Sequence, residues 1–288
     1  MKLRQSERKK AKIRLALQAP SGGGKSYSAL LLAKGIMNSD LTKVAVIDTE
    51  NGSADLYAHL GNYNVLTLPN PFSPERYIEA IELCEKSGIE VIIIDSISHC
   101  WEFLLDFHSS LAGNSFTNWG KVTPRQKSFV DKILQSKCHI IATMRTKQDY
   151  VLNQKDGKYI PEKVGLKAVQ RDGIDYEFTL VFDIDIKHNA IASKDRTGLF
   201  MDKPEFVINS STGKKILDWC NSTMTLQELK SKVEACMTLD ELTGLYNANP
   251  DIGKKIEQDF IQKRNLLQKL INIKNFSTNG TTNNYPKA

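Results

Sequence analysis

Paired cysteines are missing from this chain of 288 residues, because its five cysteines are scattered and none shows the C-x-x-C spacing. Scattered cysteines argue against a zinc site and against a disulfide framework, and they fit a reducing compartment. A long apolar run is also missing, since none approaches the ~20 residues of a membrane span. The basic N-terminus lacks the apolar stretch of a signal peptide. We therefore expect a soluble, cytoplasmic protein that does not contact a membrane.

The excess of positive charge is small, with a formal net charge of +6, but it is unevenly placed. Between Met1 and Arg14 seven basic residues stand against one acid, Glu7. The seven are Lys2, Arg4, Arg8, Lys9, Lys10, Lys12 and Arg14. Such a cluster can contact nucleic-acid phosphates, or it can be a solvated tail. Residues 1–12 are accordingly predicted to form a basic N-terminal arm.

Apolar β-branched runs alternate with helical patterns along the first half of the chain. The predicted strands are Ile13–Gln18, Lys43–Asp48, Val65–Leu68, Glu90–Asp95 and His139–Met144. The predicted helices are Tyr27–Asn38, Pro74–Ser87, Cys100–Leu111 and Pro124–Gln135. This alternation predicts an α/β fold with a mostly parallel sheet covered on both faces, and a ligand at the carboxyl ends of the strands.

Beyond Gly173 the pattern changes twice. Phe178–Ile186 and Ala190–Ser193 read as a hairpin on the sheet edge. The predicted core therefore spans residues 13–220. A helical C-terminal appendage is predicted at residues 221–272, with helices at Leu226–Ala235, Leu239–Asn247 and Ile252–Ile271. Residues 273–288 are polar, without an apolar period, and are predicted to be a disordered tail.

A glycine-rich loop between the first strand and the first helix carries the strongest motif. Ala19 stands where the phosphate-binding loop usually has its first glycine, and the rest of the motif is intact. A flexible loop without a ligand is the alternative. The motif predicts ATP and Mg²⁺, with Lys25 at the β and γ phosphates and the Ser26 hydroxyl on the metal. The nucleotide-binding residues are predicted to be Pro20, Ser21, Gly22, Gly23, Gly24, Lys25, Ser26 and Tyr27.

Acidic residues end two of the predicted central strands. Asp95 follows four consecutive apolar β-branched residues and is the preferred ligand for the water shell of Mg²⁺, with Asp48 as its rival. Because Ser96 follows Asp95, the water-activating base must come from elsewhere. Glu50 lies two residues past the end of another strand and can orient the attacking water, or it can cap a helix near Ser53.

The chain resembles the RecA-type ATPases over roughly residues 10–220. In that family a glutamate after the second core strand activates water and an Asp-Ser pair ends the magnesium strand, as Glu50 and Asp95-Ser96 do here. The resemblance implies a RecA-like core. Residues 140–145 are similar to the strand that senses the γ-phosphate and relays its presence to a DNA-binding loop. The resemblance implies that Thr143 contacts the nucleotide; familiar members have Gln at this position.

The segment 192–198 is similar to the Lys-x-Arg element of ring-forming and filament-forming relatives, including DnaB-like helicases and KaiC-like ATPases. There the two cations reach the γ-phosphate held by a neighbouring subunit as arginine fingers. Lys194 and Arg196 point to the same side of a strand and can address one phosphate together. A solvated pair on an edge strand is the alternative. The resemblance implies a homo-oligomer with composite ATP sites.

Two segments are predicted to be loops that bind single-stranded DNA. The segment 145–171 holds seven basic residues against three acids, with tyrosines interleaved, and Gly113–Arg125 is a second candidate. Lysines placed only for solubility are the alternative. The contact residues are predicted to be Arg145, Lys147, Tyr150, Lys155, Lys158 and Tyr159 in the first segment, and Trp119 and Lys121 in the second.

Together these motifs most resemble phage-encoded, AAA-type ATP-binding proteins of the single-strand annealing and recombination kind. The resemblance implies action on single-stranded DNA in a bacterial cell or phage-infected host, with a single-strand binding protein or a helicase as a further partner. The alternatives are a nucleotide-switched helicase loader or KaiC-like regulator that acts on a protein, and a small-molecule kinase. The Lys-x-Arg element and the lack of an obvious lid speak against the kinase.

Overall fold

The computed structural model describes residues 11–155, 158–221 and 226–278. The chain divides into two compact units: Lys12–Asp218 form one, and Trp219 onward forms the other together with the N-terminal residues. The segment 1–10, most of the predicted basic arm, lies outside the described residues.

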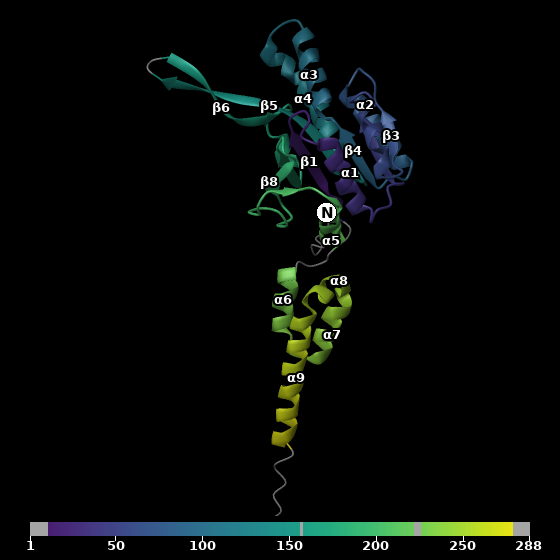
Figure 1. The fold of residues 1–288 in the computed structure, drawn as a ribbon, viewed down its shortest axis with the longest axis vertical. Helices are drawn as coiled ribbons and strands as arrows, with labels where there is room; N and C mark the ends of the chain where they lie inside the picture. Colours follow the sequence, from purple (N-terminus) through teal and green to yellow (C-terminus); the bar gives the residue numbers. More distant parts are fainter. Residues whose placement is uncertain (1–10, 156–157, 222–225, 279–288) are drawn as a thin grey trace, which may run out of the picture. The chain divides into compact units, whose positions relative to one another are not determined.

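The larger unit is built on a nine-stranded sheet in the order β3-β2-β4-β5-β1-β7-β8-β9, with β6 paired to β5 alone (Figure 1). All pairings from β3 to β7 along this order are parallel, and β8 and β9 add an antiparallel edge. The strands are β1 (Arg14–Ala19), β2 (Val44–Asp48), β3 (Asn64–Thr67), β4 (Val91–Asp95), β5 (His139–Lys155), β6 (Lys158–Ala168), β7 (Leu180–Ile184), β8 (Asn189–Asp195) and β9 (Phe206–Val207). The α/β fold with a mostly parallel sheet is confirmed.

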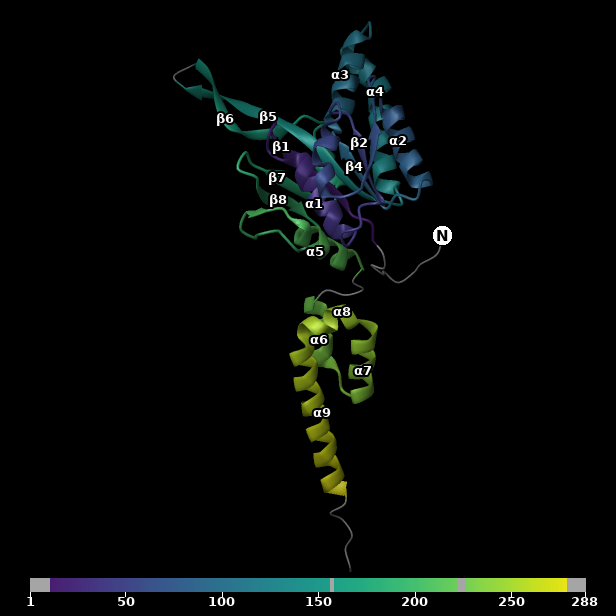
Figure 2. The same ribbon diagram turned by 45° about the vertical axis from the view of Figure 1, so that its right-hand side comes forward.

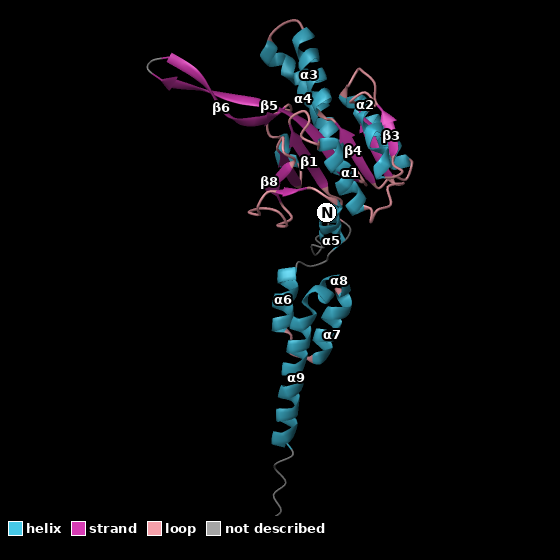
Figure 3. Ribbon diagram, in the orientation of Figure 1, coloured by secondary structure: helices cyan, strands magenta, loops and turns pink. Residues whose placement is uncertain are grey.

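Helices cover both faces of the sheet (Figures 1 and 3), as the unbroken apolar runs of β2 and β4 require. On one face Tyr77 and Ile81 of α2 and Phe129 of α4 pack on Ile92 and Ile94. α1 contacts β1, β4 and β5. The helices of this unit are α1 (Lys25–Ile36), α2 (Pro74–Lys86), α3 (Ser98–Ser110), α4 (Ser115–Gln135) and α5 (Ser210–Asn221), with short 3-10 helices at Ser53–Leu60 (η1) and Ile174–Glu177 (η2).

Two predicted loops are regular structure, so both predictions of a loop were wrong. The segment from Arg145 onward is not a loop, because β5 continues to Lys155 and returns as β6 in an antiparallel hairpin that projects from the sheet in both ribbon views (Figures 1 and 2). The second segment forms the first half of α4. Its helix begins at Ser115 because the Asn114 side chain caps it, accepting from the Phe116 N–H at 2.8 Å.

The smaller unit is helical and has its own apolar core. Leu229 and Val233 pack with Leu242, Phe260 and Leu267. Its helices are α6 (Leu226–Ala235), α7 (Leu239–Ala248), α8 (Pro250–Gly253), η3 (Lys254–Ile256) and α9 (Glu257–Thr278). α9 continues to Thr278, past residue 273, where the tail was predicted to start. In the described part of the chain no helix is both long enough and apolar enough to cross a membrane.

Candidate nucleotide-binding site

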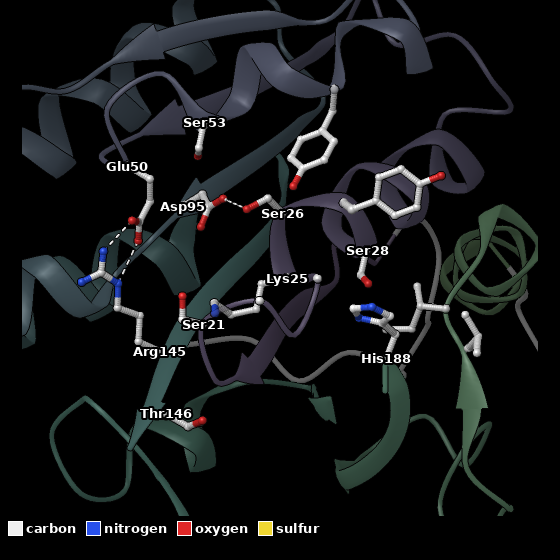
Figure 4. A pocket seen from close by; sticks show the side chains of 16 residues that line it. Ser21, Lys25, Ser26, Ser28, Glu50, Ser53, Asp95, Arg145, Thr146 and His188 are labelled. Carbon is white, nitrogen blue, oxygen red and sulfur yellow. Dashed lines mark hydrogen bonds and ion pairs between the residues drawn. The ribbon is translucent and has the colours of Figure 1, made fainter. Parts of the chain in front are cut away.

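A cavity of about 850 Å³ lies at the carboxyl ends of the central parallel strands. Ser21 and Lys25 of the glycine loop line it, with Glu50 after β2, Asp95 at the end of β4 and Arg145 on β5 (Figure 4). The Ser53 and Thr146 side chains also line the cavity, and their hydroxyl oxygens are buried without a hydrogen-bond partner in the described residues. A polar ligand can supply those hydrogen bonds.

The glycine loop accommodates the alanine that replaces its first glycine. Ala19 is the last residue of β1 and is fully buried. A Cβ on Gly23 would lie 2.8 Å from the Ala19 Cβ, so the alanine methyl fits because residue 23 has no side chain. Gly24 has a φ of 83° directly before α1, and a Cβ there would meet the His188 ring at 3.1 Å. The loop is thereby closed in the shape that presents the start of α1 to an anion.

Lys25, the first residue of α1, reaches back across the loop. Its Nζ donates to the Ala19 and Pro20 carbonyls, at 3.0 Å each. Burial lowers the pKa of Lys25, and the Arg145 charge acts in the same direction, while Asp95 and Glu50 oppose them. A triphosphate would relieve the repulsion between these two cations.

Asp95 joins the glycine loop to the sheet. Its Oδ2 accepts from the Ser26 hydroxyl, and its Oδ1 accepts from Thr143 Oγ1 at 2.5 Å. Burial raises the pKa of Asp95, and these two hydrogen bonds oppose that change. A buried carboxylate beside a hydroxyl provides the hard oxygen ligands that Mg²⁺ prefers, so the residues present fit this cation. Within the described residues no cluster of three His, Cys, Asp or Glu side chains exists, so the remaining ligands would be phosphate oxygens and water.

Asp48, the rival ligand, has a different environment. Its carboxylate accepts from the Glu50 N–H at 2.6 Å and from the Ala54 N–H at 3.3 Å. Asp48 therefore shapes the turn after β2 and caps η1, a role that the sequence suggested for Glu50. The Glu50 side chain is left to enter the cavity.

Glu50 forms a two-pronged ion pair with Arg145 (Figure 4). Arg145 Nε donates to Oε1 at 3.0 Å and Nη2 donates to Oε2 at 2.5 Å. The Ser96 hydroxyl donates to Oε1 at 3.3 Å, and His99 Nε2 lies 3.9 Å from that oxygen. Burial acts to raise the pKa of Glu50, but the Arg145 hydrogen bonds and charge lower it below its ordinary value.

The cavity lining also includes the predicted Tyr27 and three residues that sequence reasoning missed, Tyr57, His188 and Val207. Tyr27 lies in the first turn of α1, with its ring 5.6 Å from Tyr57 of η1. His188 lies in the turn between β7 and β8 and Val207 in β9; both line the cavity. Asp185 fixes this turn by accepting from the Lys187 and Asn189 N–H groups at 2.8 Å. The polar turn between two strands was visible in the sequence, but its contact with the glycine loop was not.

Thr143 and the two finger candidates lie outside the cavity lining. Thr143 is fully buried and contacts Asp95. Lys194 and Arg196 do lie together, because both donate to the Tyr176 carbonyl, Arg196 at 3.2 Å. Lys194 pairs with Val181, which pairs with Ala16. Since Ala19 is three residues further along β1, Lys194 lies on the order of 10 Å back from the glycine loop.

The predicted nucleic-acid residues fall into three environments. Arg145 is in the cavity. Lys147 is exposed at the base of the β5–β6 hairpin. Tyr150, Lys155, Lys158 and Tyr159 belong to that hairpin, but their side chains lie outside the described residues.

On α4, Lys121 is exposed, whereas Trp119 is packed. Its ring stacks on His108 at 4.3 Å and on Trp101 at 6.1 Å between centroids. Packing against α3 therefore uses the faces of the Trp119 ring.

Comparison with known proteins supports the identification that this geometry suggests. A family model described as an AAA domain matches residues 11–217, most of the chain and nearly all of the larger unit. A search of curated proteins finds no match. The glycine loop, the buried Asp95 beside Ser26 and the parallel sheet all lie within the matched residues. This chain belongs to the AAA domain family of P-loop ATPases.

Proposed function

We propose that this protein hydrolyses ATP with Mg²⁺ in the cavity at the end of the parallel sheet. The observation that carries the proposal is the meeting of Lys25 and Ser26 with Asp95 and Glu50. Ser26 and Asp95 would hold Mg²⁺, which supplies positive charge to the β and γ phosphates. Lys25 binds the same phosphates from the loop. Tyr27, Tyr57 and His188 also line the cavity, and we expect the nucleoside to fit against them.

Glu50 is the proposed base. It orients a water molecule whose oxygen forms the bond to the γ-phosphorus, while the bond to the bridging oxygen breaks and its electron pair leaves with ADP. The water proton passes to Glu50 and then to the phosphate product. The Ser26 hydroxyl donates a hydrogen bond to Asp95 and not to Glu50, so Glu50 is the carboxylate of the site that is left to act as the base.

We further propose that single-stranded DNA is the macromolecular ligand. The β5–β6 hairpin begins at Arg145, in the cavity, and projects from the sheet (Figures 1 and 2). By sequence, the segment 145–171 holds seven basic residues against three acids, together with Tyr150 and Tyr159. Cations that follow phosphates and rings that stack on bases suit a single strand. DNA recombination, annealing or replication in a phage or bacterial cell is the corresponding process.

A homo-oligomer, ring or filament, completes this proposal. Lys194 and Arg196 share one partner, the Tyr176 carbonyl, and lie away from the cavity of their own chain. Two cations so placed can serve a neighbouring subunit's γ-phosphate as fingers.

A second candidate is a nucleotide-switched regulator that binds a protein, such as a helicase or a single-strand binding protein. Exposed apolar side chains favour it. Phe116 at the start of α4 is 85% exposed, and Leu266 and Leu270 on α9 are 51% and 50% exposed. Leu266 and Leu270 are four residues apart and so lie on one face of the helix, and contiguous exposed apolar surface marks sites of protein contact.

Steady-state ATP hydrolysis with and without single-stranded DNA, over a range of protein concentration, tests these proposals. Lys25→Ala serves as the blank. We expect DNA to stimulate hydrolysis, and the rate per subunit to rise with concentration. A rate that DNA leaves unchanged would favour the protein-binding regulator, and no rate above the blank would refute hydrolysis itself.

A further inference from the structure

Arg145 lies where β5 leaves the core of the sheet. Its Cα pairs with Ala19 of β1, and the next residue, Thr146, begins the pairing with β6. Its N–H donates to Ser98 Oγ at 3.0 Å, and its carbonyl accepts from the Val169 N–H at 2.7 Å. The main chain is held on both sides, so the guanidinium can change partners without any movement of the strand.

The ion pair of Arg145 with Glu50 separates two cavities. Both residues line the cavity of about 850 Å³ and a second one of about 300 Å³, which Phe72 and His99 also line. The Arg145 side chain is 39% exposed and that of Glu50 is 23% exposed. A phosphate group in the larger cavity would therefore meet an accessible guanidinium.

Of the two described side chains of β5 that line the larger cavity, Arg145 and Thr146, Arg145 carries the charge that attracts a γ-phosphate. Thr143 and Arg145 are two residues apart on one strand and point to the same side. Thr143 is buried and bound to Asp95, so a ligand meets Arg145 instead. Arg145 offers the planar set of donors that phosphate oxygens accept in pairs.

The same pairing restrains Glu50. Both of its carboxylate oxygens accept from the guanidinium, and Arg145 lowers the pKa of Glu50 against the opposing effect of burial. A carboxylate held in this way is a weak base and has less freedom to orient water. Release of Arg145 would restore both properties.

We infer that Arg145 senses the γ-phosphate: its guanidinium exchanges Glu50 for the phosphate oxygens of ATP, and the exchange frees Glu50 to orient water. This inference rests on the proposed ATP hydrolysis at the same site. ADP lacks the γ-phosphate and leaves the Arg145–Glu50 pair intact. Arg145 thereby distinguishes triphosphate from diphosphate and couples that distinction to the base.

Binding measurements test the exchange without depending on turnover. We would titrate the wild type, Arg145→Gln, Glu50→Gln and the double variant with Mg²⁺ and either ADP or the non-hydrolysable AMP-PNP. Arg145→Gln is expected to weaken AMP-PNP binding about ten- to hundredfold, the range for a charged hydrogen bond, and to leave ADP affinity within about twofold. Glu50→Gln is expected to tighten AMP-PNP several-fold more than ADP, and this gain should vanish in the double variant.

Unchanged ADP affinity also shows that each variant is folded. Arg145→Lys is the conservative control: it keeps the charge without the paired donors, so it should fall between the wild type and Arg145→Gln. If Arg145→Gln alters AMP-PNP and ADP affinity equally, or alters neither, the exchange is refuted. Loss of the proposed function would look different, because the wild type would then bind AMP-PNP no better than Lys25→Ala.

Discussion

At the scale of single residues, the glycine loop shows how one exception to a motif is accommodated. The sequence identified the loop by Lys25 and Ser26 in spite of Ala19, and the structure explains why the alanine is tolerated: Gly23 leaves room for its methyl group. The roles of Lys25, Ser26, Asp95 and Glu50 could be proposed from the sequence because each follows a strand that its own neighbours define. The partner of Glu50 could not, since Arg145 is remote in sequence.

Gly23→Ala should therefore weaken nucleotide binding, by about tenfold or more, since a methyl there would lie 2.8 Å from the Ala19 Cβ and 3.2 Å from the Pro20 carbonyl oxygen. The second change Ala19→Gly removes the first of these contacts and should restore part of the affinity. Titration with a fluorescent ATP analogue measures both effects. Equal affinity in Gly23→Ala and the wild type would show that the loop does not need this close approach.

Asp95→Asn should stabilise the fold at neutral pH while it removes Mg²⁺-dependent ATP binding. Burial raises the pKa of Asp95 above its ordinary 3.8, so the folded state takes up a proton more readily than the unfolded state. The stability that this provides is present below 3.8 and is lost as the pH rises through the raised pKa. At pH 7, well above the ordinary carboxyl value, burying Asp95 is therefore a cost, and Asn should add about 1 kcal/mol.

Urea denaturation at several pH values, each with and without the substitution, measures this difference. The advantage of Asn should shrink as the pH falls toward the ordinary carboxyl value. Thr143→Val is the matched control, because it removes a hydrogen bond to Asp95 and keeps the charge; it should destabilise. An Asp95→Asn variant less stable than the wild type at pH 7 would contradict the argument.

At the scale of helices and strands, prediction succeeded where burial imposes a pattern. Val91–Asp95 and Val44–Asp48 are buried throughout and were predicted within a residue at each end. The start of α4 was missed because Pro124 suggested the first turn of a helix, whereas Asn114 caps it ten positions earlier. β6 was missed because a hairpin paired only to itself shows no apolar alternation; the Asp-Gly pair at 156–157 was its signal in the sequence.

The β5–β6 hairpin should carry DNA binding separately from nucleotide binding. Replacing residues 149–165 by Asn-Gly would join Gln148 to its partner Leu166 in a short turn. We expect single-strand binding and its stimulation of hydrolysis to be lost, with ATP affinity unchanged. Fluorescence anisotropy with a labelled oligonucleotide, at several salt concentrations, measures the binding of the single strand.

Single substitutions refine that measurement. Lys155→Gln and Lys158→Gln should each lower the slope of log affinity against log salt by about 0.7, the value for one phosphate contact on a single strand. Lys86→Gln on α2, a side chain that is 79% exposed, is the control and should leave the slope unchanged. If all three substitutions lowered the slope equally, the change would reflect the net charge of the protein and not a contact of the hairpin with DNA.

At the scale of the whole molecule, the finger pair lies outside the lining of its own chain's cavity, and this makes assembly testable. The RecA resemblance singled out Lys194 and Arg196, and the structure shows that they share the Tyr176 carbonyl. Which subunit they serve cannot be read from one chain, because a composite site depends on an interface that the sequence of one copy does not specify.

Mixing two inactive variants should restore hydrolysis if the sites are composite. Lys25→Ala subunits keep their fingers and Arg196→Ala subunits keep their phosphate loops. In a random one-to-one mixture about a quarter of head-to-tail interfaces combine both intact parts, so about a quarter of the wild-type rate is expected. Mixing Lys25→Ala with the Lys25→Ala/Arg196→Ala double variant should give none. A mixture of the two single variants without activity would reject fingers supplied by a neighbour.

The length of β5 has a mechanical consequence. The strand runs unbroken from His139 to Lys155, with its first part fixed between β4 and β1 and the rest paired only to β6. From Arg145 to Lys155 the projecting part extends roughly 33 Å, so a tilt of about 5° at its base would move its end by ~3 Å. Such a lever amplifies motion outward and multiplies force inward: a pull on the far end acts on the Arg145–Glu50 pair with mechanical advantage, and tension on a bound strand becomes a signal in its own right.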